Sequence, residues 1–311
     1  MGAILSKQRK TVAVCGATGQ QGGATVKALV KLGRYTIRAI TRDPTSAKAQ
    51  ALAAMPGVQV VQADFDDLAS MEKAFNGCDA VFAVTDFWKA CGLDPVKELQ
   101  QGKNLVDAAK AAQVKHFVWS TLEDTRPLVG DSLQPVNGDY KVPHFDAKGE
   151  IEAYASAKLQ GVFTFVVTSV FYENILPGGG MGPSKQPDGS FSLFIPSGDC
   201  KLAWCATEDI GGVAAAVIAA GPKKYGGKTV PVAGEVVTTA EVAAILSKVS
   251  GKNVVAVTPP PEEWAKAVMG FGVPELAAKD LANMFVYYQK ANEHFLSLRS
   301  LKDTKKVSGD T

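Results

Sequence analysis

Six short apolar runs divide the first 170 residues, and helical segments separate them. The runs lie at residues 12–15, 35–40, 58–61, 80–84, 116–119 and 163–168. Nearly continuous apolar runs of this length are typical of strands buried on both faces. Between them apolar positions recur at helical spacing, as Ala24, Ala28, Leu29 and Leu32 do. Strands that alternate with helices predict an α/β fold with a doubly wound parallel sheet, followed here by a smaller mixed α/β C-terminal lobe.

A glycine-rich turn joins the first predicted strand to the first predicted helix. Gly16, Gly19 and Gly22 have the spacing G-x-x-G-x-x-G. Such glycines let the backbone turn sharply and let a diphosphate approach the N–H groups of the helix N-terminus. Glycines also occur in purely structural turns, but the flanking strand and helix favour a dinucleotide site of the Rossmann type. The residues expected to contact the diphosphate are Gly16, Ala17, Thr18, Gly19, Gln20, Gln21 and Gly22.

The residues after the second strand indicate which dinucleotide would bind. NAD sites usually place an acidic residue here for the ribose 2′-hydroxyl. This chain has Arg42 first, then Asp43 and Ser46, and a cationic residue suits a 2′-phosphate. Pro44 follows Asp43, so we expect Asp43 to serve in a turn. NADP(H) is the predicted cofactor.

Other polar residues end strands on the edge of the sheet where ligands bind. Asp64 follows the third strand and either faces the adenine side of a dinucleotide or caps the next helix. Thr85, Asp86 and Phe87 follow the fourth strand, and we expect them at the cofactor cleft. Ser120 follows the fifth strand, where a polarising hydroxyl or an ordinary turn residue would both fit.

A predicted helix from 142 to 154 bears on whether the protein is an enzyme. Short-chain dehydrogenases carry Tyr and Lys four residues apart here, with Tyr as the proton donor and Lys lowering its pKa. This chain retains Lys148, but His144 occupies the Tyr position. His144 could donate a proton near neutral pH or could be a structural residue beside a cofactor-binding lysine. The sequence favours the structural role.

Composition excludes several classes of function. The chain has 311 residues with 33 Lys and Arg against 31 Asp and Glu, and it lacks a basic stripe, so direct nucleic-acid binding is not expected. The 5 cysteines lack metal-ligand spacing, so we expect no metal site and a reducing, cytoplasmic environment. The start, Met1-Gly2-Ala3-Ile4-Leu5-Ser6, fits an N-myristoylation pattern as well as a chance leader. A single acyl chain would give reversible membrane attachment.

The pattern divides the chain into four parts. We expect a flexible leader at 1–10, a dinucleotide-binding domain at 11–170, a C-terminal lobe at 171–301 interleaved with it, and a disordered tail at 302–311. The lobe would complete the cleft. A glycine-rich segment at 177–183 would be a flap over the cleft or a plain linker.

Several motifs together resemble the NmrA-like family, whose members are atypical short-chain dehydrogenases. They are G-A-T-G-Q-Q-G-G at 16–23, T-R-D-P at 41–44, V-T-D-F-W at 84–88, Q-G-K at 101–103, H-F-D-A-K-G-E-I-E at 144–152, F-Y-E-N at 171–174 and D-L-A-N-M-F at 280–285. The resemblance extends from Val12 to about Leu296. Gln100 and Asp86 depart from it, since the family often has Lys and Asn there.

The resemblance implies roles for residues along the whole cleft. Lys148 would bind the nicotinamide ribose, and Phe171, Tyr172, Glu173 and Asn174 would flank the nicotinamide. The branch that this chain is most similar to contains redox sensors, which respond to NADPH and bind partner proteins. The resemblance therefore implies a regulator with an unidentified protein partner. We expect the protein in the cytoplasm, with reversible membrane association or nuclear entry as further locations. The alternative is an NADPH-dependent reductase of a quinone, aldehyde or other small carbonyl or aromatic substrate, with His144 or Tyr172 as proton donor. The oligomeric state is not indicated.

Overall fold

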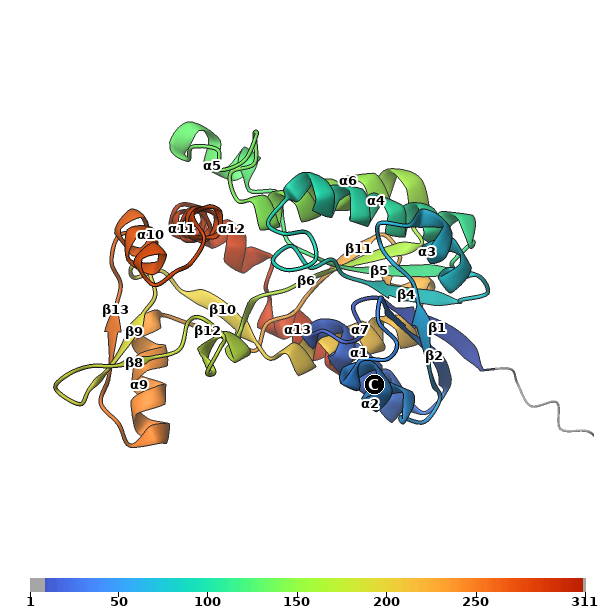
Figure 1. Ribbon diagram of the computed structural model, residues 1–311, viewed down its shortest axis with the longest axis horizontal. Helices are drawn as coiled ribbons and strands as arrows, with labels where there is room; N and C mark the ends of the chain where they lie inside the picture. The colour runs from blue at the N-terminus through green and yellow to red at the C-terminus, as the bar shows by residue number, and fades with distance from the viewer. Residues whose placement is uncertain (1–8, 310–311) are drawn as a thin grey trace, which may run out of the picture.

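A seven-stranded parallel sheet forms the centre of the protein, whose computed structural model describes residues 9–309 (Figure 1). Its strand order is β11-β6-β5-β4-β1-β2-β3, and all neighbouring strands are parallel. The strands are β1 (Lys10–Val14), β2 (Tyr35–Thr41), β3 (Val58–Gln62), β4 (Ala80–Ala83), β5 (His116–Thr121), β6 (Phe163–Val167) and β11 (Lys228–Pro231). The order reverses between β1 and β4, and in doubly wound sheets ligands bind at the carboxyl end of that switch point. The predicted fold class is confirmed.

Helices cover both faces of this sheet because successive strand residues point to opposite sides. Val12 and Val14 of β1 join a core with α1 and α7, whereas Ala13 and Cys15 join a core with α3, α4 and α6. Figure 1 shows these two groups of helices on opposite faces. Their bounds are α1 (Gln20–Leu32), α2 (Ala47–Ala53), α3 (Leu68–Phe75), α4 (Pro95–Ala111), α6 (Pro143–Leu159), α7 (Thr207–Ala220) and α8 (Pro222–Tyr225).

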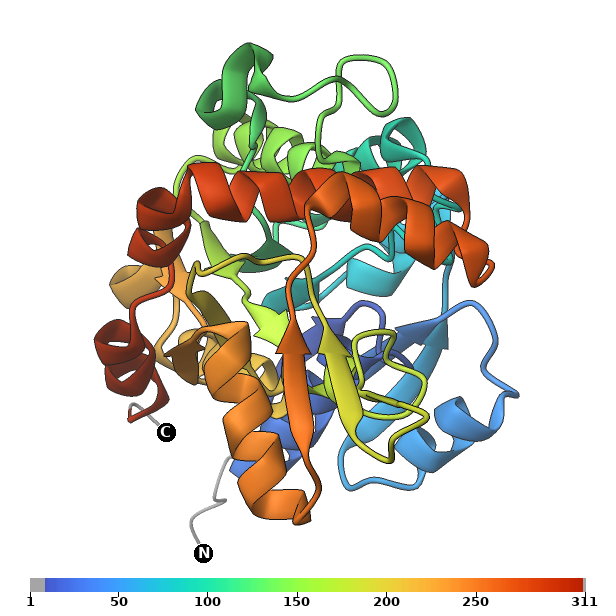
Figure 2. The same cartoon turned by 90° about the vertical axis from the view of Figure 1, so that its left-hand side faces the viewer.

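The C-terminal lobe contains two small sheets and packs beside the carboxyl ends of the main strands (Figure 2). One sheet has the order β12-β10-β7 and the other β13-β9-β8. The strands are β7 (Val170–Phe171), β8 (Ser184–Lys185), β9 (Phe191–Phe194), β10 (Leu202–Cys205), β12 (Glu235–Val237) and β13 (Val254–Val257). The helical elements are η2 (Tyr172–Ile175), α9 (Thr239–Ser250), α10 (Pro261–Gly270), α11 (Glu275–Lys290) and α12 (Asn292–Ser297). In Figure 2 the long helix α11 crosses the lobe above the sheet of β13 and β9.

The chain returns from the C-terminal lobe to the main sheet through α7 and β11. Helix α7 packs closely on α1, and a Cβ atom on Gly211 would lie 2.4 Å from the backbone carbon of Ala24. Strand β11 extends the sheet beyond β6. This strand was not among the predicted apolar runs, because Lys228 and Thr229 are exposed and only Val230 is buried.

Two segments beyond the core differ from the sequence expectations. The tail expected to be disordered from 302 instead forms α13 (Leu301–Ser308), capped by Ser300, with Thr304 and Val307 buried. These two buried side chains, three residues apart, give α13 an inward face that its overall polarity concealed. The loop expected from 123 to 142 contains two short helical turns, α5 (Arg126–Val129) and η1 (Gly130–Ser132).

Residues 1–8 of the expected leader, with the myristoylation pattern at Gly2 and Ser6, lie outside the described residues, and Lys10 already belongs to β1. Within residues 9–309, none of the helices combines the length and apolar character that crossing a membrane requires.

Candidate functional site

The turn between β1 and α1 is built so that the backbone itself lines the site. Gly16 has a φ of +60°, and a Cβ atom on Gly22 would lie 2.3 Å from the carbonyl oxygen of Gly16. Helix α1 therefore starts against the turn with no room for a side chain at Gly22. Gly19 is the N-cap residue, and neither a side-chain cap nor an acidic first-turn residue occupies the helix N-terminus. Free N–H groups and the helix dipole make this end suited to an anion such as a diphosphate.

Arg42 follows β2 and extends from the same edge of the sheet. Its side chain is exposed and forms no ion pair with any residue between 9 and 309. Asp43 forms no ion pair with Arg42 in the described part of the chain, and its Oδ1 instead accepts hydrogen bonds from the backbone N–H and the hydroxyl of Thr45, at 2.8 and 2.6 Å. These hydrogen bonds hold the pKa of Asp43 below its usual value. The predicted turn role of Asp43 is confirmed, while Ser46 serves as the N-cap of α2.

Asp64 is half-buried after β3, and its Oδ1 accepts a hydrogen bond from the N–H of Asp66 at 3.0 Å. The alternative role as N-cap of the next helix is wrong, because Asp67 caps α3 at the N–H groups of Ala69 and Ser70. The reason is spacing, since α3 begins only at Leu68 and a capping side chain must directly precede the helix.

Lys148 lies in a buried polar cluster with Thr85 and Glu98. Its Nζ is 2.5 Å from Glu98 Oε1 and 2.9 Å from Thr85 Oγ1, and the Thr85 hydroxyl also donates to Glu98 Oε1 at 2.6 Å. Glu98 is fully buried and Lys148 is 8% exposed. Glu98 Oε2 has no hydrogen-bond partner in the described part of the chain. The ammonium of Lys148 is thus already paired with a carboxylate that sequence reasoning did not single out.

His144 lies one helical turn before Lys148 but contacts a different carboxylate. Its Nδ1 is 2.7 Å from Oδ2 of Asp280, which is fully buried on α11. The imidazole also packs against the rings of Trp88 and Phe145, with centroid distances of 4.9 and 4.8 Å. His144 and Lys148, one turn apart on α6, therefore form two separate acid–base pairs.

The segment from Phe171 to Asn174 is half-buried, and two of its side chains contact neighbouring elements of the protein. Tyr172 stacks on Trp204 at 6.1 Å, and burial together with the nearby Glu235 carboxylate raises the pKa of its phenol. Glu173 accepts hydrogen bonds from the N–H and hydroxyl of Thr207, where α7 begins. A raised phenol pKa disfavours Tyr172 as a proton donor.

The remaining predicted residues lie around the switch point between β1 and β4. Asp86 is exposed, and its Oδ1 accepts a hydrogen bond from the N–H of Lys89 at 3.1 Å. Phe87 is buried beside it. The Ser120 hydroxyl donates to Gln21 Oε1 at 2.6 Å, which links β5 to the first turn of α1. One edge of the sheet therefore brings together the glycine turn, the end of β4 and the end of β5.

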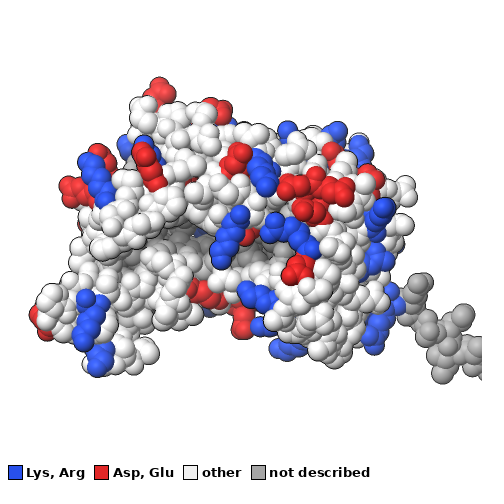
Figure 3. Space-filling model, viewed as in Figure 1, with Lys and Arg blue, Asp and Glu red and all other residues white. Residues whose placement is uncertain are grey.

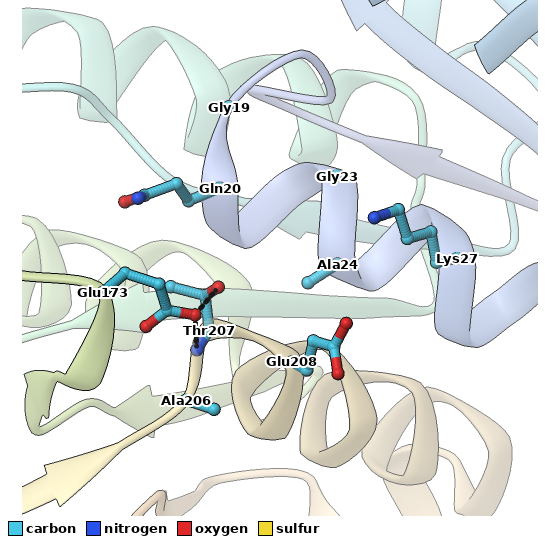
Figure 4. Close-up of a pocket in the computed structure, with 9 residues that line it drawn as sticks. All are labelled: Gly19, Gln20, Gly23, Ala24, Lys27, Glu173, Ala206, Thr207 and Glu208. Carbon is cyan, nitrogen blue, oxygen red and sulfur yellow. Dashed lines mark hydrogen bonds between the residues drawn. The ribbon is translucent and has the colours of Figure 1, made fainter. Parts of the chain in front are cut away.

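A cavity of about 360 Å³ adjoins this edge between the first turns of α1 and α7 (Figure 4). It is lined by Gly19, Gln20, Gly23, Ala24, Lys27, Glu173, Ala206, Thr207 and Glu208. Figure 3 shows a hollow between the two lobes with Lys and Arg side chains at its margin. The uncapped helix N-terminus thus opens toward space rather than toward protein.

A family model described as the NmrA-like family matches residues 8–307. The chain belongs to the NmrA-like family. Among its curated relatives, an NmrA-like family domain-containing oxidoreductase, notA, from Aspergillus sp. (strain MF297-2) is 32% identical over 255 residues, covering 77% of this chain and 72% of the relative. Another, the oxidoreductase cpsB from Aspergillus campestris (strain IBT 28561), is 29% identical over 306 residues, covering 93% and 85%.

Solved structures share the fold over nearly the whole chain. An NADPH-dependent quinone oxidoreductase from Escherichia coli, complexed with NADPH, has a TM-score of 0.74 and 29% identity, covering 96% of this chain and 94% of the other. NmrA, a negative transcriptional regulator in complex with NADP, has a TM-score of 0.77 and 23% identity, covering 97% and 91%. NmrA and this family member thus have the same fold.

Sequence reasoning missed two carboxylates of the candidate site, Glu98 and Asp280. Glu98 lies in a predicted helix, where an acidic residue is most often exposed. Asp280 belongs to the motif D-L-A-N-M-F at 280–285, but it lies 136 positions from His144. Only the folded chain brings these carboxylates next to Lys148 and His144.

Proposed function

We propose that this protein binds NADP(H) across the carboxyl edge of its main sheet. The observation that carries the proposal is the glycine turn, where Gly22 lies so close to Gly16 that backbone N–H groups alone can line the site. The diphosphate would bind at Gly16 to Gly22, and the exposed guanidinium of Arg42 would bind the 2′-phosphate. The quinone oxidoreductase crystallised with NADPH, at 29% identity, supports this choice of cofactor.

The deeper part of the site also fits the cofactor. Thr85, Phe87 and Lys148 would line the ribose beside the nicotinamide, with Asp64 toward the adenine. Lys148 Nζ already contacts Glu98 Oε1, the Thr85 hydroxyl and, at 3.5 Å, the Thr85 carbonyl oxygen, so a hydrogen bond to the ribose would replace the longest of these contacts. Asp86 is exposed and points its Oδ1 to a local N–H group, which lessens repulsion of an anionic ligand.

The activity that the site supports best is reduction of a small quinone or carbonyl compound. Bound NADPH would supply the hydride. Reduction at oxygen also needs a proton, and His144 would supply it from Nε2, because only its Nδ1 atom forms a hydrogen bond within residues 9–309. The curated relatives named oxidoreductases support this activity.

A redox sensor is the second candidate, and the buried pair of Lys148 and Glu98 favours it. In an active short-chain dehydrogenase the lysine acts on a neighbouring tyrosine, whereas here no tyrosine occupies position 144 and the lysine is held by a carboxylate. A sensor would bind NADPH and NADP with different affinities and would present different loops to a regulatory protein. Such binding requires no turnover.

One experiment separates these roles. Purified protein would be titrated with NADPH and with NADP by calorimetry, and NADPH absorbance would then be followed with a panel of quinones and aldehydes. We expect binding of both forms and steady consumption of NADPH with at least one quinone. Binding that discriminates between the forms without consumption would support the sensor, and failure to bind either form would contradict both roles.

A further inference from the structure

The interaction of His144 with Asp280 joins the two lobes at the active face. His144 lies in the first turn of α6, which belongs to the dinucleotide-binding half, and Asp280 lies on α11 of the C-terminal lobe. Their side chains approach to 2.7 Å, between Nδ1 and Oδ2. Asp280 is 0% exposed and His144 is 7% exposed. The contact is therefore shielded from water, where a charge-assisted hydrogen bond is strongest.

Asp280 has no other strong partner to compensate its burial. Its Oδ1 has no hydrogen-bond partner within the described residues, so the imidazole carries the stabilisation of this carboxylate. An ionised carboxylate only accepts hydrogen bonds, so Nδ1 must carry a hydrogen when it faces Oδ2. The neutral ring is then the tautomer in which Nε2 is an open acceptor.

The rest of the imidazole is held by aromatic rings. Phe87, Trp88 and Phe145 surround it, with centroid distances of 6.0, 4.9 and 4.8 Å. Phe87 and Trp88 follow β4 at the carboxyl edge of the sheet, and the Trp88 side chain is 40% exposed. These contacts restrict rotation of the imidazole, which lies beside the exposed Trp88 at this edge of the sheet.

We propose that Asp280 is a positioning residue for the reductase reaction, acting through His144. This inference rests on the proposed function. Asp280 keeps the hydrogen on Nδ1, so Nε2 is the atom that gives its proton to the oxygen of the quinone or carbonyl as the hydride adds. The imidazolium loses one proton, the substrate gains one hydride and one proton, and NADP is left as the oxidised product. Solvent then returns the proton to Nε2.

A purely structural contact between the lobes would make a different prediction. It would stabilise the fold but would not require a particular tautomer or affect turnover selectively. The conservative variant Asp280→Asn keeps the shape of the side chain while its amide can donate to Nδ1. Asn283→Ala is the matched control, because Asn283 lies on the same helix and links the lobes through hydrogen bonds to the carbonyls of Gln134 and Lys141.

The first test reads the tautomer directly. Nitrogen NMR of the full chain labelled at histidine assigns each ring, and the protein has only 3 histidines. His116, whose pKa burial lowers to about 4, and the exposed His294 are internal references. We expect hydrogen on Nδ1 of neutral His144 in the wild type and in Asn283→Ala, and a shift toward hydrogen on Nε2 in Asp280→Asn. Hydrogen on Nε2 in the wild type would overturn the inference.

The second test asks whether Asp280 acts through His144. We expect His144→Gln to lower kcat for quinone reduction by roughly 100-fold or more, as loss of a general acid does. Asp280→Asn should lower kcat in the presence of His144 but not further in the His144→Gln background, with the KM for NADPH unchanged. Equal effects of Asp280→Asn in both backgrounds would contradict the inference. A wild-type protein that consumes no NADPH would instead contradict the proposed function. The NMR experiment would then still show whether Asp280 fixes the tautomer of His144.

Discussion

At the scale of single residues, the site depends on charges that are paired out of water. Lys148 and Glu98 form a buried ion pair, with Lys148 also lying 5.7 Å from the centroid of the Trp119 ring. Removing one partner of a buried pair leaves the other charge uncompensated. Lys148 therefore contributes to stability as well as to any binding of ribose.

This arrangement predicts the outcome of mutating Lys148. We expect Lys148→Met to lower the free energy of unfolding by roughly 3–5 kcal/mol, because Glu98 is left buried without a counter-charge. The double variant Lys148→Met, Glu98→Gln should recover most of that loss. Urea unfolding followed by circular dichroism measures both. If Lys148→Met were as stable as the wild type, the pair of Lys148 and Glu98 would not stabilise the fold.

At the scale of elements, close contact between α1 and α7 sets the position of the phosphate-binding helix. Gly211 of α7 faces the backbone of Ala24, whereas a Cβ atom on its neighbour Gly212 would meet no atom within 4 Å. Neither glycine has a positive φ. The two positions thus differ in packing while sharing the same helix and the same residue type.

The two glycines allow a comparison of alanine substitutions at a packed and an open position of the same helix. Gly211→Ala should destabilise the fold, because the added methyl group would force α7 away from α1 and overpacking costs about 1–3 kcal/mol. Gly212→Ala should stabilise it by up to about 1 kcal/mol, since alanine favours a helix more than glycine does. Denaturant midpoints compare the two. Similar shifts for both variants would contradict the close approach of these helices.

Residue periodicity and local motifs predicted much of the molecule but not its long-range pairings. The glycine turn is a continuous stretch, so its strand, turn and helix were evident from spacing. Glu98 and Asp280 were missed because their partners lie 50 and 136 positions away. The helical tail was missed because its inward face consists of only Thr304 and Val307. Contacts between distant parts of the chain, rather than local sequence pattern, determine the pairings of Glu98 and Asp280 and the inward face of the helical tail.

At the scale of the whole molecule, the buried ion pair of Arg299 and Glu123 joins the C-terminal lobe to the dinucleotide-binding half. Arg299 binds both oxygens of Glu123 at 2.9 Å, and the Tyr287 hydroxyl donates to the same carboxylate at 2.5 Å. Arg299 also donates to the carbonyl of Thr168 at 2.8 Å. Burial alone would raise the pKa of Glu123, but the guanidinium and the hydrogen bonds from Arg299 and Tyr287 outweigh it, so the pKa lies below 4.5.

The sign of this shift predicts how stability depends on pH. A carboxyl group with a lowered pKa in the folded state stabilises the protein above its ordinary pKa of 4.5, and that contribution is lost as pH falls through the folded-state value. We expect Glu123→Gln to lower stability at neutral pH and to flatten its decline in acid. Glu262→Gln, at an exposed surface pair with Lys266, should leave the curve unchanged. Thermal unfolding from about pH 3 to pH 7 measures this, and parallel curves for Glu123→Gln and wild type would contradict it.

Binding of NADP(H) is the central claim, and Arg42 provides its most direct test. Arg42 follows the carboxyl end of β2, while Arg34 precedes the amino end of the same strand and contacts the ring of Tyr35. Calorimetric titration of wild type, Arg42→Ala and Arg34→Ala with NADPH and NADH would compare their dissociation constants. We expect Arg42→Ala to weaken NADPH binding roughly 10- to 150-fold, as loss of a charged hydrogen bond does, with NADH binding and the Arg34→Ala variant unaffected. Equal binding of NADPH by wild type and Arg42→Ala, or no binding by the wild type, would contradict the account.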